Sequence, residues 1–288
     1  MTGVPSPPRT ERSWLEEHGI RPNKRWGQNF LLDPRIPRLM VERASWGPRV
    51  PILEIGPGGG ALTSALLEAG HSVRAIEKDP RLVEVLQHRF SECEDRFEVV
   101  LGDALKTEWL PGESALPGTK PWMAGNLPYS ITTPLLIRAL ALHRHLAGVV
   151  MMVQREYGER LLSAAGNKTY GSITAWTRVH GDARSLLKVG RSSFWPRPGV
   201  ESVVLELAFP DPPRFEGNRG LVERVIRAGF SQRRKKLRNT LASGLHLEKE
   251  QVETVLRSVQ LDPEARAETL EWSDFVAFAQ ALETTLEE

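Results

Sequence analysis

Short apolar runs alternate with amphipathic stretches through the first two thirds of the chain. Residues 72–77 are typical of a buried strand, whereas residues 61–69 place Leu62, Leu66 and Ala69 on one face, as a helix does. The same reading predicts strands at 50–55, 72–77, 97–101, 121–125, 148–154, 185–189 and 202–209, and helices at 37–45, 61–69, 80–90, 131–142 and 172–180. Repeated strand-helix units predict an α/β fold with a doubly wound parallel sheet, and we expect the last two strands to pair antiparallel at its edge.

The pattern changes at Pro210-Asp211-Pro212-Pro213, after which only helical periodicity remains, at 219–230, 234–242, 248–257 and 269–284. We therefore expect an α/β domain at residues 21–212 and a small all-helical domain at residues 213–288. Residues 1–20 are expected to be a disordered N-terminal tail, apart from a short helix at 13–18. Its Pro-rich start lacks the apolar core of a secretory signal.

Composition adds a local charge asymmetry to this outline. The 288 residues carry a formal net charge of only +2, but residues 224–238 contain seven Lys or Arg and no acid, and residues 264–288 contain seven acids and one Arg. Such a cluster can mark a polyanion-binding face that the average hides. Cys93 is the only cysteine and no apolar run reaches membrane-spanning length, which favours the reducing cytoplasm.

A cofactor site is predicted where the first strands end. The strand at 50–55 runs into a glycine-rich turn that contains Gly56 and Gly58, which fits either a dinucleotide or S-adenosylmethionine. Glu77 ends the second strand, where a carboxylate can reach ribose hydroxyls, and Asp103 follows the third, where it can accept a hydrogen bond from an adenine amine. A solvated acid and a helix N-cap are the alternatives. Two acids without an obvious phosphate-binding Lys favour a cofactor that lacks a pyrophosphate.

A second site signal is the tetrapeptide Asn126-Leu127-Pro128-Tyr129, between an apolar run and a helical stretch. An Asn side chain and a backbone carbonyl both accept hydrogen bonds from an amino group, and a Tyr ring stacks on a flat heterocycle. The tetrapeptide therefore suits the exocyclic amine of a nucleobase, although Asn-x-Pro is also ordinary turn chemistry.

Together, these motifs resemble those of the KsgA-like small-subunit ribosomal RNA adenine N6-dimethyltransferases, over nearly the whole chain. The motifs in chain order are RWGQNFL at 25–31, EIGPG at 54–58, GDA at 102–104, NLPYSITTP at 126–134, FWPRP at 194–198 and FSQRRKKLRN at 230–239. Each motif is short, but their joint occurrence in this order is specific.

The resemblance implies a Rossmann-like S-adenosylmethionine methyltransferase that modifies N6 of two adjacent adenosines near the 3′ end of small-subunit (16S) rRNA during 30S maturation. Each adenosine would receive two methyl groups. The implied cofactor-binding residues are Gln28, Asn29, Leu31, Gly56, Gly58, Glu77, Lys78, Asp103, Ala104 and Asn126. Asn126 and the Leu127 carbonyl would accept the two amino hydrogens of the base, Tyr129 would stack on one of its faces, and Phe194 would cover the other.

Three positions depart from the family pattern. Trp26 stands where Phe is common, Lys78 where an apolar residue is common, and Trp195 where a smaller residue is frequent. Trp195 bears on the shape of the base pocket. The alternatives to the small-subunit enzyme are a methyltransferase of large-subunit rRNA, a mainly non-enzymatic ribosome-assembly factor, and an NAD-dependent oxidoreductase.

The predicted partner is small-subunit rRNA within an immature 30S particle. Lys24 and Arg25 lie beside the predicted cofactor entrance, and the basic cluster opens a helix of the small domain, where a merely solvated helix face is the alternative. The predicted RNA-binding residues are Lys24, Arg25, Arg233, Arg234, Lys235, Lys236 and Arg238. The seven histidines show no metal-binding spacing, so no metal is expected, and nothing suggests a dimer seam, so we expect a monomer.

Overall fold

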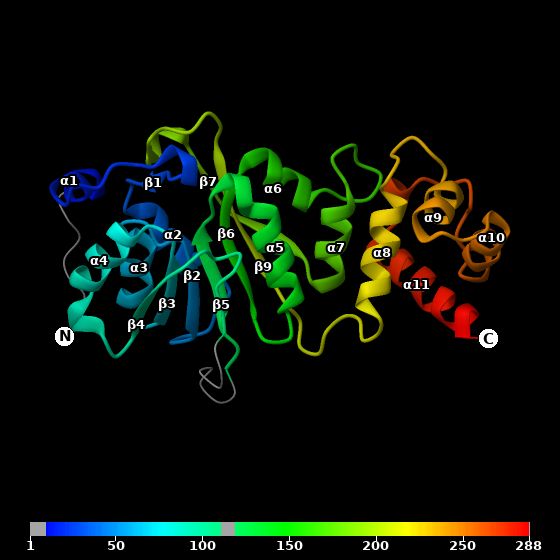
Figure 1. The fold of residues 1–288 in the computed structure, drawn as a ribbon, viewed down its shortest axis with the longest axis horizontal. Helices are drawn as coiled ribbons and strands as arrows, with labels where there is room; N and C mark the ends of the chain where they lie inside the picture. The colour runs from blue at the N-terminus through cyan, green and yellow to red at the C-terminus, as the bar shows by residue number, and fades with distance from the viewer. Residues whose placement is uncertain (1–9, 111–118, 288) are drawn as a thin grey trace. The chain divides into compact units, whose positions relative to one another are not determined.

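The computed structural model describes residues 10–110 and 119–287, and this part follows the alternation expected from the sequence (Figure 1). The strands are β1 (Phe30–Leu31), β2 (Pro51–Ile55), β3 (Ser72–Glu77), β4 (Phe97–Leu101), β5 (Trp122–Asn126), β6 (Gly148–Gln154), β7 (Ala183–Val189), β8 (Phe194–Trp195) and β9 (Ser202–Ala208). The α-helices are α1 (Glu11–Glu17), α2 (Arg35–Arg43), α3 (Ala61–Glu68), α4 (Pro80–Arg89), α5 (Thr132–Ala141), α6 (Arg155–Leu162), α7 (Ser172–His180), α8 (Arg219–Gly229), α9 (Leu237–Leu245), α10 (Lys249–Ser258) and α11 (Trp272–Glu287).

Seven strands form one sheet in the order β4-β3-β2-β5-β6-β9-β7. The first five of these are mutually parallel, and β9 runs antiparallel to β6, so the doubly wound α/β fold is confirmed. The chain builds β3 and β4 on one side of β2 and then places β5 and β6 on the other. In such sheets, ligands bind at this switch point, beyond the carboxyl ends of the strands.

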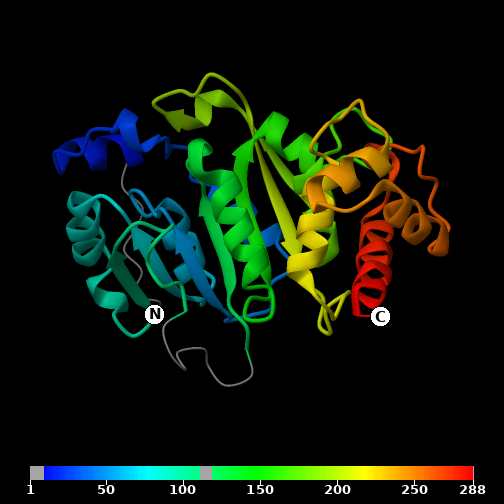
Figure 2. The ribbon, with the colours of Figure 1, turned by 45° about the vertical axis from the view of Figure 1, so that its right-hand side comes forward.

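Local sequence explains the elements around the switch point. The first six residues of β6 are all buried, as expected of a central strand covered on both faces. The helix α4 begins with Pro80 in its first turn, and the Asp79 side chain caps it by accepting a hydrogen bond from the Arg81 N–H. The helix α5 connects the parallel strands β5 and β6 and lies beside them in both views (Figures 1 and 2).

The chain divides into two compact units, and the division differs in one respect from the domains expected from sequence. The first unit comprises residues 1–158 and 184–209, and the second comprises 159–183 and 210–288. The second unit thus begins at the expected proline-rich break but also takes in α7 and the segment before it. The ring of Tyr170 in that segment contacts Phe230 at a centroid distance of 5.8 Å, and Phe230 contacts Phe275 of α11 at 5.7 Å. Because these rings pack together, the segment belongs to the helical unit.

The short helix expected at 13–18 is present as α1, whereas the expectation of disorder is wrong for the rest of residues 10–20; residues 1–9 lie outside the described part. The helix α1 begins at Glu11, and Leu15 and Ile20 are almost completely buried against Phe30 and Leu82. This apolar cluster makes α1 part of the first unit.

Candidate active site

One pocket lies at the carboxyl ends of β2, β3, β4 and β5, and the glycine-rich turn after β2 forms part of its wall. Gly56 and Gly58 have φ angles of 67° and 58°, a left-handed conformation that strains residues with a side chain. The Gly56 N–H donates to the Ile76 carbonyl at 3.0 Å, which ties the turn to β3. The turn therefore lines the pocket with backbone that a ligand can approach closely.

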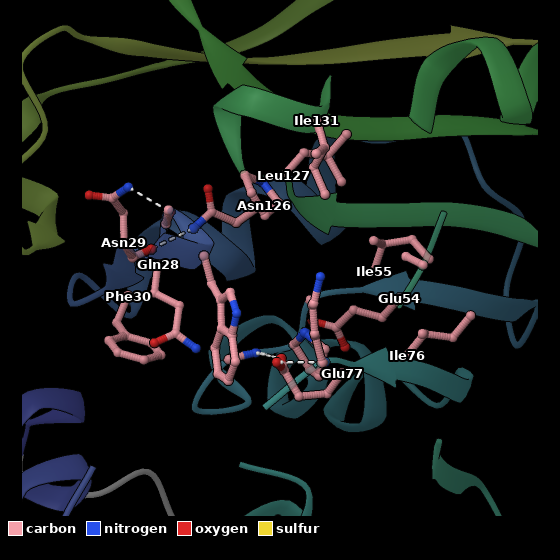
Figure 3. A pocket seen from close by; sticks show the side chains of 18 of the residues that line it. Gln28, Asn29, Phe30, Glu54, Ile55, Ile76, Glu77, Asn126, Leu127 and Ile131 are labelled. Carbon is pink, nitrogen blue, oxygen red and sulfur yellow. Dashed lines mark hydrogen bonds between the residues drawn. The ribbon is translucent and has the colours of Figure 1, made fainter. Parts of the chain in front are cut away.

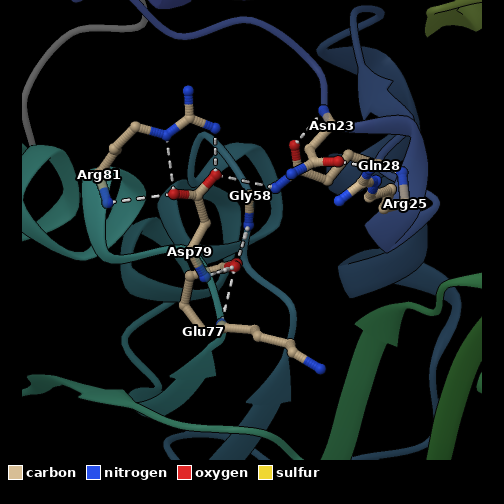
Figure 4. Close-up of polar contacts among 8 residues, drawn as sticks. Asn23, Arg25, Gln28, Gly58, Glu77, Asp79 and Arg81 are labelled. Carbon is tan, nitrogen blue, oxygen red and sulfur yellow. Dashed lines mark hydrogen bonds and ion pairs between the residues drawn. The ribbon is translucent and has the colours of Figure 1, made fainter.

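Glu77, at the end of β3, is a buried carboxylate held by backbone donors. It accepts hydrogen bonds from the N–H groups of Lys78 (2.8 Å), Asp79 (2.9 Å) and Gly58 (3.3 Å), as Figure 4 shows in part. Burial nevertheless raises the pKa of Glu77 to about 7. The carboxylate lines the pocket and can accept hydrogen bonds from two neighbouring hydroxyl groups of a ligand.

A second buried carboxyl, Glu54 on β2, lines the same pocket and was assigned no function from sequence. The Thr63 hydroxyl donates to it at 2.6 Å, and burial raises the pKa of Glu54 to about 7. The neighbouring charge of Glu77 raises this pKa further. An acid inside the apolar run of a strand was the available signal for this residue.

Asp103 lies in the turn after β4, and both oxygens of its carboxylate already have partners. Oδ1 accepts from the Leu105 N–H at 3.0 Å, and Oδ2 pairs with the Lys78 ammonium at 2.8 Å. This hydrogen bond from Lys78 is the main reason that the pKa of Asp103 lies below its ordinary value. The turn thus presents a carboxylate acceptor that is ionised at neutral pH.

Asn126, the last residue of β5, has an orientation that its hydrogen bond determines. Its Nδ2 donates to the Asn29 backbone carbonyl at 2.8 Å, and both side chains line the pocket (Figure 3). Only the NH₂ half of an amide can pair with a carbonyl oxygen. Oδ1 therefore remains as an acceptor, and among the described residues it has no hydrogen-bonding partner.

Leu127 and Tyr129 of the same tetrapeptide are also held in place by hydrogen bonds. Leu127 is 1% exposed, and its N–H donates to the Met152 carbonyl at 3.2 Å. The Tyr129 hydroxyl lies 2.7 Å from the Ser202 Oγ, and burial raises the pKa of Tyr129. The ring is thus anchored at its hydroxyl and lines the pocket.

Phe194, expected to cover one face of the base, lies in the core of the first unit. Strand β8 pairs antiparallel with β1, so that Phe194 faces Leu31 and Trp195 faces Phe30. Because alternate residues of a strand point to opposite sides, Phe194 enters the core and is 3% exposed, while Trp195 packs against Phe30 at a centroid distance of 6.0 Å. Phe194 is not among the residues that line the pocket, although its strand partner Leu31 is.

All ten residues predicted to bind the cofactor line this one pocket. They are Gln28, Asn29, Leu31, Gly56, Gly58, Glu77, Lys78, Asp103, Ala104 and Asn126. Gln28 is held between the Asn23 N–H and the Asp79 carboxylate, at 2.8 and 3.2 Å (Figure 4). Asp79 was not singled out from sequence, yet it connects this N-terminal segment to the end of β3.

The charges of the lining indicate which ligand fits. The pocket is lined by the acids Glu11, Glu54, Glu77 and Asp103 and by the cations Arg25 and Lys78. An excess of acid disfavours the pyrophosphate of a dinucleotide and suits a cationic ligand. These carboxylate acceptors beside an open glycine turn fit S-adenosylmethionine, which carries a sulfonium, ribose hydroxyls and an adenine amine.

The predicted RNA-binding residues separate into two groups. Arg25 is exposed at the pocket, and Lys24 begins the short 3-10 helix η1 (Lys24–Trp26). The other five lie in the second unit around the start of α9 at Leu237. Arg233, Arg234 and Lys235 precede the helix, Lys236 is its N-cap residue, and Arg238 lies in its first turn, so the helix starts later than the expected residue 234.

Three of the five clustered cations are engaged by acids of the second unit. Arg233 pairs with Glu268 at 2.9 Å, Lys236 pairs with Glu264, and Arg238 pairs with Glu253 at 2.6 Å and with Glu264 at 3.0 Å. The acids that looked separate in sequence therefore fold onto the basic cluster. Arg234 and Lys235 are exposed and form no ion pair with any described residue.

Residues 10–110 and 119–287 contain no group of three or more His, Cys, Asp or Glu side chains placed to hold a metal ion. No helix in this part of the chain is long and apolar enough to cross a membrane.

Comparisons with known proteins agree over almost the full length. A family model described as Ribosomal RNA adenine dimethylase matches residues 19–283. A protein of Moorella thermoacetica named Ribosomal RNA small subunit methyltransferase A is 38% identical over 98% of this chain and 100% of its own length. A Geobacillus kaustophilus protein of the same name is 36% identical over 97% of each chain.

Two solved structures share the fold. A dimethyladenosine transferase from Plasmodium falciparum matches with a TM-score of 0.73 and 27% identity, covering 86% of this chain and 95% of its own. The 23S rRNA methyltransferase ErmE matches with a TM-score of 0.68 and 25% identity, covering 88% and 99%.

Proposed function

The chain belongs to the ribosomal RNA adenine dimethylase family, and we propose that it methylates N6 of two adjacent adenosines near the 3′ end of small-subunit rRNA, placing two methyl groups on each. The relatives of 36–38% identity carry the name of the small-subunit enzyme. The large-subunit alternative is not favoured, because the 23S rRNA enzyme resembles this chain at only 25% identity.

The methyl donor is S-adenosylmethionine, which supplies an electrophilic methyl group on its sulfonium when bound. We assign the ribose hydroxyls to the Glu77 carboxylate and the adenine amine to Asp103. The glycine turn at Gly56 and Gly58 permits close approach of the rest of the S-adenosylmethionine molecule, and Asn29 and Leu31 border the same part of the pocket. This assignment is supported by the shared pocket and by its excess of acid.

The observation that carries the mechanism is the hydrogen bond from Asn126 Nδ2 to the Asn29 carbonyl. It leaves Oδ1 as an acceptor in the pocket, where we propose that it receives one N–H of the target amine. The Leu127 carbonyl receives the other. Two acceptors hold the nitrogen so that its lone pair points at the methyl carbon, and this alignment is the catalytic contribution.

No strong base is required at Asn126 in this scheme. An adenine N6 is a poor nucleophile because its lone pair is delocalised into the ring. Its proton becomes acidic only once the new carbon–nitrogen bond has replaced the carbon–sulfur bond of the sulfonium, and it can then pass to water. An amide cannot act as a base at neutral pH, but it can orient the amine. The second transfer then requires the mono-methylated amine to rotate, so that its remaining N–H faces an acceptor.

Tyr129 is proposed to stack on the extruded adenine, with its ring steadied by the bond to Ser202. The second face of the base was assigned to Phe194, whose side chain is buried in the core. Covering by Phe194 would require it to leave that core. We therefore assign base stacking to Tyr129 alone.

The RNA partner extends the proposal beyond the pocket. We propose that Lys24 and Arg25 hold the target strand and that Arg234 and Lys235 contact phosphates of an immature 30S particle. The protein would act as a monomer in the cytoplasm. Binding that persists in an inactive variant would add a function as an assembly checkpoint.

Methylation of purified 30S and 50S particles tests the substrate assignment. We expect labelled methyl groups to enter 30S rRNA from S-adenosylmethionine and to appear as dimethyladenosine after digestion. Preferential labelling of 50S particles would contradict the small-subunit assignment.

A further inference from the structure

Arg138, in the last turn of α5, holds the turn that carries Asp103. Its Nη1 donates to the Ala104 carbonyl at 2.8 Å, and its Nη2 donates to the Thr107 carbonyl at 2.7 Å. The guanidinium also lies over the Trp109 ring, 4.9 Å from the centroid. Trp109 is 1% exposed, and its Nε1 donates to the same Ala104 carbonyl at 2.8 Å. The Ala104 oxygen therefore accepts two hydrogen bonds and is firmly oriented.

The peptide that joins Ala104 to Leu105 links this anchor to the pocket. Its carbonyl oxygen is held by Arg138 and Trp109, and its N–H, the Leu105 N–H, donates to Asp103 Oδ1 at 3.0 Å. A peptide unit is planar, so fixing the carbonyl also fixes the direction of the N–H. Arg138 thus orients the donor that sets the Asp103 carboxylate.

The rest of the turn is arranged around the same peptide. The Lys106 and Thr107 N–H groups donate to the Asp103 carbonyl at 2.8 Å, and the Gly102 N–H donates to the Glu77 carbonyl at 2.8 Å. The turn's outward carbonyls at Ala104 and Thr107 are the two that Arg138 takes. Residues Gly102, Asp103, Ala104 and Leu105 all line the pocket, whereas Arg138 does not.

We infer that Arg138 is a positioning residue that sets Asp103 to receive the adenine of the cofactor. The inference rests on the proposed function, because it takes Asp103 as the adenine acceptor. It also assigns a second function to α5. This helix follows the tetrapeptide through the 3-10 helix η3 (Tyr129–Ile131), so one continuous segment carries the target-base residues and steadies the cofactor turn.

Substitution of Arg138 tests the inference by ligand binding and by kinetics. Arg138→Met removes both donors, and we expect the Kd for S-adenosylhomocysteine, measured by calorimetry, to rise about tenfold. The KM for S-adenosylmethionine should rise similarly, while kcat at saturating cofactor stays within about twofold, since Arg138 touches no reacting group. Arg138→Lys retains one donor and should fall between the two proteins.

Ile137→Ala is the matched control, because Ile137 precedes Arg138 on the same helix and is 41% exposed. Its Kd should match that of the unchanged protein. If Arg138→Met does not fold, Arg138→Lys and Trp109→Phe carry the test, since each removes a donor to the Ala104 carbonyl. Unchanged cofactor Kd and KM in the folded variants would overturn the inference and leave the proposed function standing. Failure of the unchanged protein to bind S-adenosylhomocysteine would overturn both.

Discussion

Hydrogen bonds to the backbone determine what each pocket side chain can do. The NH₂ group of Asn126 donates to the Asn29 carbonyl, which leaves its oxygen as an acceptor, whereas the Glu77 carboxylate accepts from three backbone N–H groups. The residue types at these positions were predictable from the motifs. Which atom of Asn126 is engaged and which remains for a ligand was not predictable, because Asn29 and Asn126 are 97 residues apart and meet only in the fold.

The buried carboxyls predict a pH dependence of cofactor binding. Burial raises the pKa of Glu77 to about 7, so it gains a proton as the pH falls through 7, and one of its oxygens then becomes a donor and accepts ribose hydroxyls less well. We expect the Kd for S-adenosylhomocysteine to rise as the pH falls, by up to about tenfold per pH unit below 7. Calorimetry between about pH 5.5 and pH 8 measures this, and binding near neutral pH should release protons.

The sign of this dependence distinguishes Glu77 from an ordinary carboxylate. A solvated acid of ordinary pKa would leave binding unchanged from pH 5.5 to pH 8. Glu77→Gln should bind more weakly and lose the dependence, apart from the part that Glu54, whose pKa is also about 7, contributes. A flat profile in the unchanged protein would contradict ligand contact through Glu77.

Lys78 predicts a gain of affinity. Its ammonium occupies Asp103 Oδ2 at 2.8 Å, the acceptor assigned to the adenine amine, in an ion pair whose Lys side chain is 52% exposed. Such exposed pairs contribute up to about 1 kcal/mol. Lys78→Met keeps an unbranched stem and frees the oxygen, so calorimetry should show the Kd for S-adenosylhomocysteine fall by about two- to fivefold. Weaker binding would mean that the ammonium assists the ligand.

At the scale of elements, strong periodicity was sufficient to locate most of the sheet and its helices. The bounds of β3, β4, β6 and α7 match those expected from sequence. The helix α6 was missed because it begins at Arg155 directly after β6, so no loop residues separate the two elements in the sequence. Strand β8 was missed because its two residues are too few to show a period. Its pairing with β1 is what buries Phe194, and that pairing is a property of the fold.

Two of the five cations around the start of α9 differ from the others in their pairing, which predicts how they bind RNA. Arg234 and Lys235 are exposed and have no ion-pair partner in the described structure, whereas Arg233, Lys236 and Arg238 are paired with acids. Arg234→Ala/Lys235→Ala should weaken 30S binding and reduce the salt dependence of log K by about 1.5. A binding titration at several salt concentrations measures both quantities.

Arg224→Ala/Arg227→Ala is the charge-matched control, on the exposed side of α8. It removes the same number of positive charges from the helical unit, one of them paired with Glu223 at 4.0 Å, and leaves the turn before α9 intact. An equal loss of affinity in both variants would indicate a general charge effect and would contradict a specific phosphate contact at the turn.

At the scale of the whole molecule, the sequence was sufficient to assign an α/β unit followed by a helical one. It was not sufficient to assign residues 159–183, which are inserted between β6 and β7 yet pack with the C-terminal helices. The cause is the aromatic contact from Tyr170 to Phe230, which joins residues 60 apart in the chain. The pocket lies entirely in the first unit, so cofactor chemistry and the basic cluster belong to different units.

The central claim is that Asn126 aligns the adenine amine in the pocket where Glu77 and Asp103 hold the cofactor. It is tested most directly by single-turnover methylation of 30S particles with Asn126→Ala, at saturating S-adenosylmethionine. We expect the rate of dimethyladenosine formation to fall by about a hundredfold or more, because alignment supplies a large part of the rate. Binding of S-adenosylhomocysteine should change by no more than about threefold. Near-normal methylation by this variant would contradict the account.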